Sequence, residues 1–148
     1  MKNKRGYFGI GCINMKTTHN YGTLFRTAQI LEADFLFTIG AKFKPQASDT
    51  MKSWKHLPVF RYDTFEIFQE CRPYDCRLVG IELDSKARPL KNYTHPERCM
   101  YLLGAEDVGI SREVRDKCND LIVLPGERSM NVAVAGSIVL YDRISKLK

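Results

Sequence analysis

Short apolar runs of β-type residues alternate along the chain with stretches of helical spacing, and this alternation limits the possible folds most. Strands are expected over residues 7–13, 35–39, 59–62, 77–83, 99–103 and 121–124. Helices are expected over residues 18–32, with Thr18 or Asn20 as the cap, after the caps Thr64 and Ser111, and over residues 130–146. Strands that alternate with helices in this way favour an α/β fold with a mainly parallel sheet.

A length of 148 residues, with 44% hydrophobic and 27% charged residues, is typical of one globular domain, here 1–148. The longest nearly apolar run, 132–141, is far shorter than the roughly 18 residues of a membrane span. The basic start and the apolar stretch after it resemble a signal peptide, but Asn14 interrupts that stretch, so a first strand is the better explanation. We therefore expect a cytoplasmic protein that does not enter a membrane.

The cysteines and histidines give no sign of a metal site or a disulfide framework. The five cysteines are odd in number and form no CxxC pair, and the three histidines are scattered. We expect free thiols in a reducing compartment and no bound metal.

A glycine pair in the first strand, Gly9 and Gly11, matches only part of a dinucleotide-binding fingerprint. Asn14 occupies the place of the third glycine, and no acidic residue follows at the expected distance. The chain also lacks a P-loop and a GxSxG elbow. These absences argue against a dehydrogenase, a P-loop nucleotidase and an α/β-hydrolase.

A net charge of +6 favours a polyanionic partner, and a long insert concentrates part of this charge. The insert, residues 41–56, carries four lysines and two aromatic residues, and one acidic residue, Asp49, opposes the lysines. The six residues are Lys42, Phe43, Lys44, Lys52, Trp54 and Lys55. Cations interleaved with aromatic rings suit phosphate contact and base stacking. The alternative is a solvated loop whose Trp54 packs on the domain.

The last expected helix is apolar on nearly all of its faces. Its apolar residues are Met130, Val132, Ala133, Val134, Ala135, Ile138, Val139, Leu140 and Tyr141. Because a surface helix keeps one polar side, this helix must be covered on both sides. The cover is either a second copy of the chain or the interior of a single subunit.

Three further segments join a strand or loop to the start of a helix, where open α/β sheets bind ligands. They read Asn-Tyr-Gly-Thr-Leu-Phe-Arg-Thr-Ala over 20–28, Tyr-Leu-Leu-Gly-Ala-Glu-Asp-Val-Gly-Ile-Ser over 101–111, and Pro-Gly-Glu-Arg-Ser-Met-Asn-Val over 125–132. Taken singly, Gly22 and Gly104 suit turns, Ser129 or Asn131 suits a helix cap, and Arg26 suits a solvated helix face.

Taken together and in this order, the segments resemble the three motifs of the SpoU/TrmH family of SPOUT methyltransferases. The first motif is matched by Asn20, Gly22, Arg26 and Ala28 and the second by Leu103, Gly104, Glu106, Gly109, Ile110 and Ser111; the third is matched by Ser129, Met130, Asn131 and Val132, with Tyr141 and Asp142 following in the apolar helix. The sequence departs from the family at residues 121–123, where the family places a proline; here Pro125 comes later.

The resemblance implies a fold, a reaction and partners. The fold would be an α/β domain with a deep trefoil knot in a cofactor-binding part, about 78–148. The cofactor would be S-adenosylmethionine, and the reaction would be methylation of a ribose 2′-hydroxyl in RNA, with tRNA favoured over rRNA. The enzyme would be a minimal homodimer that joins through its C-terminal helix and has its active sites at the subunit interface. The alternatives are a non-catalytic RNA-binding module of the same fold and an RNA base methyltransferase.

The resemblance also assigns residues to roles. Catalysis would involve Arg26, Glu106, Ser129 and Asn131, with Arg26 acting as the base or as an electrostatic stabiliser of the developing alkoxide. The cofactor would contact Ile81, Glu82, Leu103, Gly104, Leu121, Ile122, Leu124, Ser129, Met130 and Ala135. RNA would contact Asn20, Arg26 and Arg128, together with Lys42, Lys44, Lys52, Trp54 and Lys55 of the insert.

Overall fold

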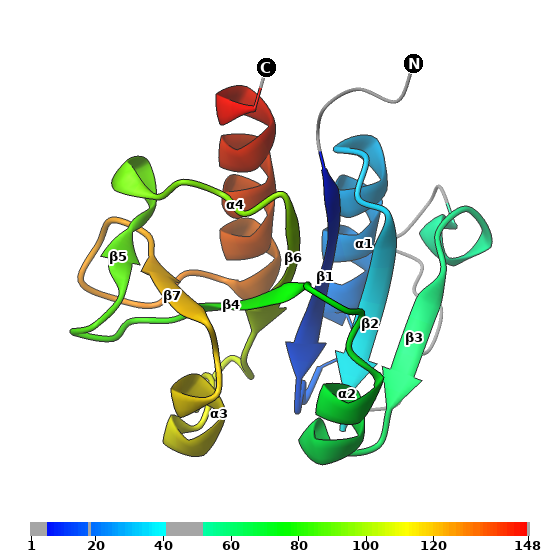
Figure 1. The fold of residues 1–148 in the computed structure, drawn as a ribbon, viewed down its shortest axis with the longest axis horizontal. Helices are drawn as coiled ribbons and strands as arrows, with labels where there is room; N and C mark the ends of the chain where they lie inside the picture. Colours follow the sequence, from blue (N-terminus) through cyan, green and yellow to red (C-terminus); the bar gives the residue numbers. More distant parts are fainter. Residues whose placement is uncertain (1–5, 18, 41–51, 148) are drawn as a thin grey trace.

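A computed structural model of the chain describes residues 6–17, 19–40 and 52–147. Its centre is one seven-stranded sheet in the order β3-β2-β1-β6-β4-β7-β5, and every neighbouring pair of strands is parallel (Figure 1). The strands are β1 (Tyr7–Ile13), β2 (Phe35–Ile39), β3 (Val59–Tyr62), β4 (Arg77–Ile81), β5 (Arg88–Pro89), β6 (Arg98–Leu103) and β7 (Asp120–Val123). The predicted α/β class with a parallel sheet is confirmed.

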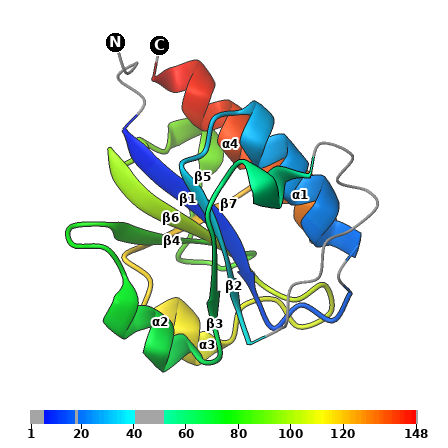
Figure 2. The ribbon, with the colours of Figure 1, turned by 90° about the vertical axis from the view of Figure 1, so that its right-hand side faces the viewer.

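Helices cover both faces of the sheet. They are α1 (His19–Ile30), α2 (Phe65–Cys71), α3 (Arg112–Asp116) and α4 (Val132–Lys146), with short 3₁₀ turns η1 (Ser53–Lys55) and η2 (Leu90–Asn92). Figure 2 shows α1 and α4 together on one face and α2 and α3 on the other. The predicted trefoil knot over about 78–148 stays a prediction.

Three helix starts follow from side-chain caps. The hydroxyls of Thr64 and Ser111 accept hydrogen bonds from backbone amides three residues later, as their sequence positions predict. The Asn131 side chain accepts from the amides of Ala133 and Val134, so α4 begins at Val132. The predicted start at residue 130 was therefore too early.

The glycine pair of β1 makes room for two aromatic rings. A Cβ atom on Gly9 would lie 2.3 Å from the ring of Phe35, and one on Gly11 would lie 2.5 Å from the ring of Phe37. The Phe37 ring in turn stacks on Phe68 of α2, with ring centroids 5.2 Å apart. The Gly-Ile-Gly fragment is thus explained by packing between strands and a helix.

A buried cation fixes the C-terminal half of α4 against the segment between η2 and β6. Arg143 is 0% exposed, and its Nη1 donates to the carbonyl of Pro96 at 2.7 Å and to the hydroxyl of Tyr101 at 3.1 Å. Its Nη2 donates to the carbonyl of Glu97 at 3.1 Å, and the guanidinium lies 4.4 Å from the ring centroid of Phe8. A buried charge needs such partners, because each unmet donor would cost free energy.

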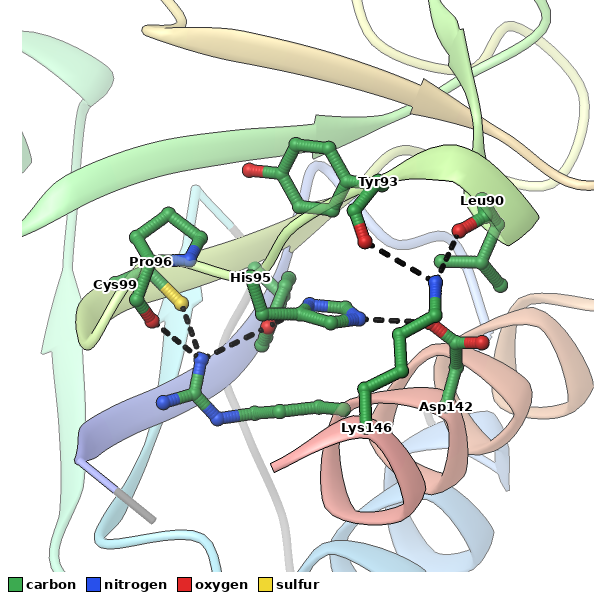
Figure 3. Close-up of polar contacts among 9 residues, drawn as sticks. Leu90, Tyr93, His95, Pro96, Cys99, Asp142 and Lys146 are labelled. Carbon is green, nitrogen blue, oxygen red and sulfur yellow. Dashed lines mark hydrogen bonds and ion pairs between the residues drawn. The ribbon is translucent and has the colours of Figure 1, made fainter. Parts of the chain in front are cut away.

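A second set of polar contacts reinforces this attachment (Figure 3). His95 lies between Tyr101, whose hydroxyl is 2.6 Å from Nδ1, and Asp142, whose Oδ2 is 2.8 Å from Nε2. Lys146 donates to the carbonyl of Leu90 at 2.6 Å and pairs with Asp142 at 2.8 Å. Because Asp142 only accepts, the neutral His95 ring places its hydrogen on Nε2 and accepts from Tyr101 at Nδ1.

The His95 contacts make stability dependent on pH. Burial lowers the pKa of His95, the cations Arg143 and Lys146 lower it further, and Asp142 opposes them. The unfolded chain then binds a proton that the folded chain excludes, so this contribution to stability is complete above pH 6.5 and is lost as the pH falls towards the folded value. We expect His95→Gln to flatten the pH dependence of unfolding by urea between pH 5 and 7.

The control for this prediction is His56→Gln, because His56 is an exposed histidine outside the contacts around α4. The control should unfold with the wild-type dependence on pH. If the free energy of unfolding depends on pH equally in His95→Gln and in the wild type, the prediction is contradicted.

Candidate active site

A cavity of about 200 Å³ opens at the carboxyl ends of β4, β6 and β7. Its lining includes most residues predicted to hold a cofactor: Ile81, Glu82, Leu103, Gly104, Leu124, Ser129, Met130 and Ala135. Leu121 and Ile122 lie outside the lining; Ile122 is buried in the core and its carbonyl accepts from the amide of Glu82. The cavity therefore combines apolar side chains from three strands with the segment that leads into α4.

The second sequence motif forms one wall of the cavity as a tight loop. The amide of Gly109 donates to the carbonyl of Ala105 at 2.8 Å, and Gly109 has a φ of 65°. A Cβ on Gly104 would lie 2.1 Å from the carbonyl carbon of Gly109. Gly104 and Gly109 are thus needed for the close approach of the two ends of the loop.

Glu82 holds this loop against the end of β4. Its Oε2 accepts from the amide of Ile110 at 2.7 Å, and its Oε1 accepts from the amide of Leu83 at 2.9 Å. Both oxygens of the predicted cofactor residue are therefore bonded to backbone amides at the cavity wall.

A hydrogen-bonded network at the cavity mouth joins all three motifs. Oε1 of Glu106 accepts from the side-chain amide of Asn20 at 2.8 Å and from the hydroxyl of Thr17 at 2.7 Å. The Asn131 side chain donates to Oδ1 of Asn20 at 3.2 Å. Three of the predicted site residues, far apart in the sequence, are thus brought together.

The network also keeps Glu106 ionised. Partial burial raises the pKa of Glu106, but hydrogen bonds from Thr17, from its own backbone amide and from Asn20 outweigh this effect and lower the pKa overall. Beside it, Lys16 forms an ion pair with Asp107, and this contact lowers the pKa of Asp107. The mouth of the cavity therefore carries fixed negative charge.

Arg26 lies apart from the cavity. It is exposed on α1, it is absent from the cavity lining, and within the described residues it makes no hydrogen bond or ion pair. One turn earlier, Thr23 lines an apolar groove between α1 and α4, together with Ala133, Val134, Ser137, Ile138 and Tyr141. Arg26 thus lies near the groove and outside the cavity of its own chain.

The α4 side of this groove exposes large apolar side chains. Val134 is 50% exposed, Ile138 is 37% exposed and Tyr141 is 64% exposed. The opposite side of α4, with Val139 and Leu140, is completely buried. The helix is therefore apolar towards the core and towards solvent, as its sequence predicts.

The described part of the insert lies at the other end of the sheet. The carbonyl of Pro58 accepts from the amide of Leu36 at the amino end of β2, whereas the cavity is at the carboxyl ends. Lys52 and Lys55 are exposed there, and Trp54 is half-buried against the core. Lys42 and Lys44 lie outside the described residues, so their predicted role in RNA binding stays a prediction.

Sequence reasoning missed several residues of the site. Thr17 precedes the first motif, and Asp107 and Val108 lie inside the second. The one available signal was the position of Thr17 just before the expected start of a helix. Nothing in the sequence indicated that its hydroxyl reaches Glu106.

The described residues show neither a metal-binding cluster nor a membrane-spanning helix. They contain no cluster of three or more His, Cys, Asp or Glu side chains that could hold a metal ion. In the same residues, no helix is long and apolar enough to cross a membrane.

The model of the SpoU rRNA Methylase family matches residues 8–141. A 23S rRNA (guanosine-2′-O-)-methyltransferase of Acinetobacter baylyi is 32% identical over 45% of this chain and 28% of its own length. A tRNA (cytidine(34)-2′-O)-methyltransferase of Ancylobacter novellus is 31% identical over 57% of this chain and 55% of its own length. The matches thus span well under two thirds of these curated relatives.

Solved structures share the fold over nearly the whole chain. An AdoMet-bound rRNA methyltransferase from Sinorhizobium meliloti has a TM-score of 0.85 at 21% identity, over 99% of this chain and 61% of its own. A structure solved to explain the 2-OH methylation of C/U34 on tRNA has a TM-score of 0.84 at 22% identity, over 97% of both chains. At these identities the similarity establishes the fold.

The Thr17 hydrogen bond gives a testable prediction. We expect Thr17→Val to raise the pKa of the Glu106 carboxyl, because the variant keeps the shape of the side chain and removes a donor to the charged form. The free energy of unfolding should fall by about 1 kcal/mol or less, as for a single hydrogen bond. NMR titration of the side-chain carboxyl carbons measures the first effect.

The matched control is Thr94→Val, because Thr94 is an exposed threonine outside the network. It should leave the Glu106 titration unchanged. An unchanged titration in Thr17→Val would show that the Thr17 contact does not form in solution.

Proposed function

The chain belongs to the SpoU rRNA Methylase family, and from this premise we propose that it transfers a methyl group from S-adenosylmethionine to a ribose 2′-hydroxyl of RNA. We favour tRNA over rRNA as the substrate. The observation that carries the proposal is the network of Asn20, Glu106 and Asn131, which joins all three family motifs at Glu106 in the lining of one cavity.

The cavity fits the proposed cofactor. Ile81, Leu103 and Leu124 offer apolar walls for an adenine ring, and the neighbouring loop offers backbone groups. The carboxylates of Glu82 and Glu106 in the lining complement a cation such as a sulfonium. When bound, S-adenosylmethionine supplies an electrophilic methyl group, so the protein needs mainly to position the acceptor.

Glu106, Asn20 and Asn131 would position the acceptor nucleotide. Because Glu106 is ionised and held by Thr17 and Asn20, it offers a fixed carboxylate to a hydroxyl or to a cation. Ser129 is exposed in the cavity lining and adds a hydroxyl at the same mouth. Together these groups would fix the sugar while its 2′-oxygen reacts.

Arg26 would act on negative charge. A guanidinium in a protein is a fixed cation with five donors, which suits a phosphate or a developing alkoxide better than it suits proton removal. Because Arg26 lies outside the cavity of its own chain, near the groove between α1 and α4, a second copy would be needed to complete the site.

The exposed face of α4 supports a homodimer. Val134, Ile138 and Tyr141 recur at helical spacing and offer a continuous apolar strip to a partner. A second copy seated on this strip and the groove would cover the face and bring Arg26 to the interface. The proposed enzyme is therefore a dimer with composite active sites.

The names of two relatives support the proposed substrate class. Both curated relatives are named as 2′-O-methyltransferases, one of 23S rRNA and the other of tRNA, which supports ribose over base as the acceptor. The structural match that spans 97% of both chains is described under tRNA methylation. The substrate named for this structure supports tRNA as the favoured substrate.

The decisive experiment is methyl transfer from labelled S-adenosylmethionine into separated tRNA and rRNA from a strain that lacks the gene. We expect a 2′-O-methylated nucleoside in the tRNA fraction by mass spectrometry. A methylated base would contradict the ribose assignment. Absence of both transfer and cofactor binding would favour the non-catalytic RNA-binding module.

Arg26→Lys tests the role of the arginine. We expect turnover to fall by about 100-fold, as when a donor to developing negative charge is removed, while cofactor affinity stays unchanged. The control is Arg98→Lys, at the amino end of β6 and away from the cavity. Near-normal turnover of Arg26→Lys would rule out both proposed roles.

Ile138→Glu tests the dimer. A charge in the apolar strip should convert dimers to monomers, because burial of an unpaired carboxylate at the interface has a large free-energy cost. The control is Ile67→Glu, since Ile67 is 42% exposed on α2, on the other face of the sheet. Sedimentation analysis measures both, and a wild-type monomer would refute the dimer.

A further inference from the structure

The edge strand β5 and its flanks carry a group of free cations, which we call the basic edge. It consists of Lys86, Arg88 and Lys91, which are all exposed. The segment 85–96 contains these cations and no acidic residue. Within the described residues, none of the three forms an ion pair.

Several other cations are neutralised. Lys16, Arg77, Arg115, Lys117 and Lys146 each have a carboxylate within 4.0 Å. Asp84, the acidic residue nearest in sequence before the basic edge, pairs with Arg115 at 3.2 Å. The positive charge of the basic edge is therefore left uncompensated.

Two cations of the basic edge, Lys86 and Arg88, lie close to the cavity. In the parallel pairing of β5 with β7, Arg88 is opposite Ile122 and Pro89 is opposite Val123. Val123 lines the cavity, as does Leu83, three residues before Lys86. Figure 1 shows β5 beside β7. Since neighbouring strands are about 4.8 Å apart, Arg88 and Pro89 lie one strand away from Val123 in the cavity wall.

The backbone under these cations is held in place from both sides. On one side, the Asp84 side chain accepts from the amide of Lys86 at 2.8 Å, and its carbonyl accepts from the amide of Ala87 at 3.0 Å. On the other side, Lys146 of α4 donates to the carbonyl of Leu90, whose side chain is buried. A fixed backbone lowers the entropy cost of binding a ligand.

A row of fixed, uncompensated cations next to a cavity suits a strand of phosphates that leaves that cavity. We propose that the basic edge binds the phosphate backbone of the RNA strand whose target nucleotide occupies the cavity. The exposed Arg128 in the cavity lining would continue this track to the site. This inference rests on the proposed function. The competing explanation is that the cations merely keep edge strands of different molecules apart.

The test is the triple variant K86Q/R88Q/K91Q, with a fluorescein-labelled poly(U) strand of about 20 nucleotides as the probe. Neutralising three phosphate contacts should lower the slope of log affinity against log salt concentration by about 2 on single-stranded RNA. We expect affinity at low salt to fall at least tenfold while cofactor affinity, measured by calorimetry, stays unchanged.

Two controls separate charge from fold. Arg88→Lys keeps the charge and should keep the salt slope, whereas Arg88→Gln should lower it by about 0.7. Arg98→Gln neutralises an exposed cation at the amino end of β6 and should leave the slope unchanged. If the triple variant fails to fold, the single variants Arg88→Gln and Lys91→Gln carry the test.

The outcomes distinguish this inference from the proposed function. If the neutralised variants bind poly(U) with the affinity and salt slope of the wild type, the role of the basic edge alone is overturned. The same result with new self-association of the variant, seen by light scattering, would establish the protective role instead. A wild type that methylates tRNA but does not bind poly(U) would also overturn the inference, whereas a wild type that does neither would overturn the proposed function.

Discussion

The guanidinium of Arg143 is shut off from water, and the position of α4 depends on satisfying it. A buried charge costs several kcal/mol unless its donors find partners, and here the carbonyls of Pro96 and Glu97 and the Tyr101 hydroxyl provide them. These partners lie just before and within β6, so the far end of α4 is tied to one central strand. The near end of the same helix begins at the Asn131 cap, and Asn131 also bonds to Asn20 in the site.

The site therefore depends on two attachments of one helix. Its C-terminal half is fixed by Arg143, His95 and Lys146, and its first residue faces the cavity. The parallel sheet then brings the other two motifs to the same end, because strands that run in one direction place their following loops together. Glu106 after β6 and Asn20 in α1 meet for this reason.

Sequence reasoning predicted the strands and helices that have a clear period or a cap, and it selected Asn20, Glu106 and Asn131 of the network but not Thr17. It missed β5, because two residues carry no periodicity and the strand exists through its pairing with β7. It assigned Arg26 and Glu106 to one site at a subunit interface, and this assignment stays a prediction, because Arg26 lies outside the cavity that Glu106 lines. It selected the insert as an RNA surface from its cations and interleaved aromatic rings, and this role stays a prediction. The described part of the insert packs at the opposite end of the sheet.

The rings of Phe35 and Phe37 over Gly9 and Gly11 make two neighbouring strands interdependent in evolution. A side chain gained on β1 would collide with a ring of β2, and a ring lost from β2 would leave a hole that glycine cannot fill. A substitution at one of these positions is therefore tolerated only when its partner position carries a compensating substitution. Relatives that carry a larger residue at position 9 or 11 should carry a smaller one at 35 or 37, so a packing constraint between strands should be readable as covariation.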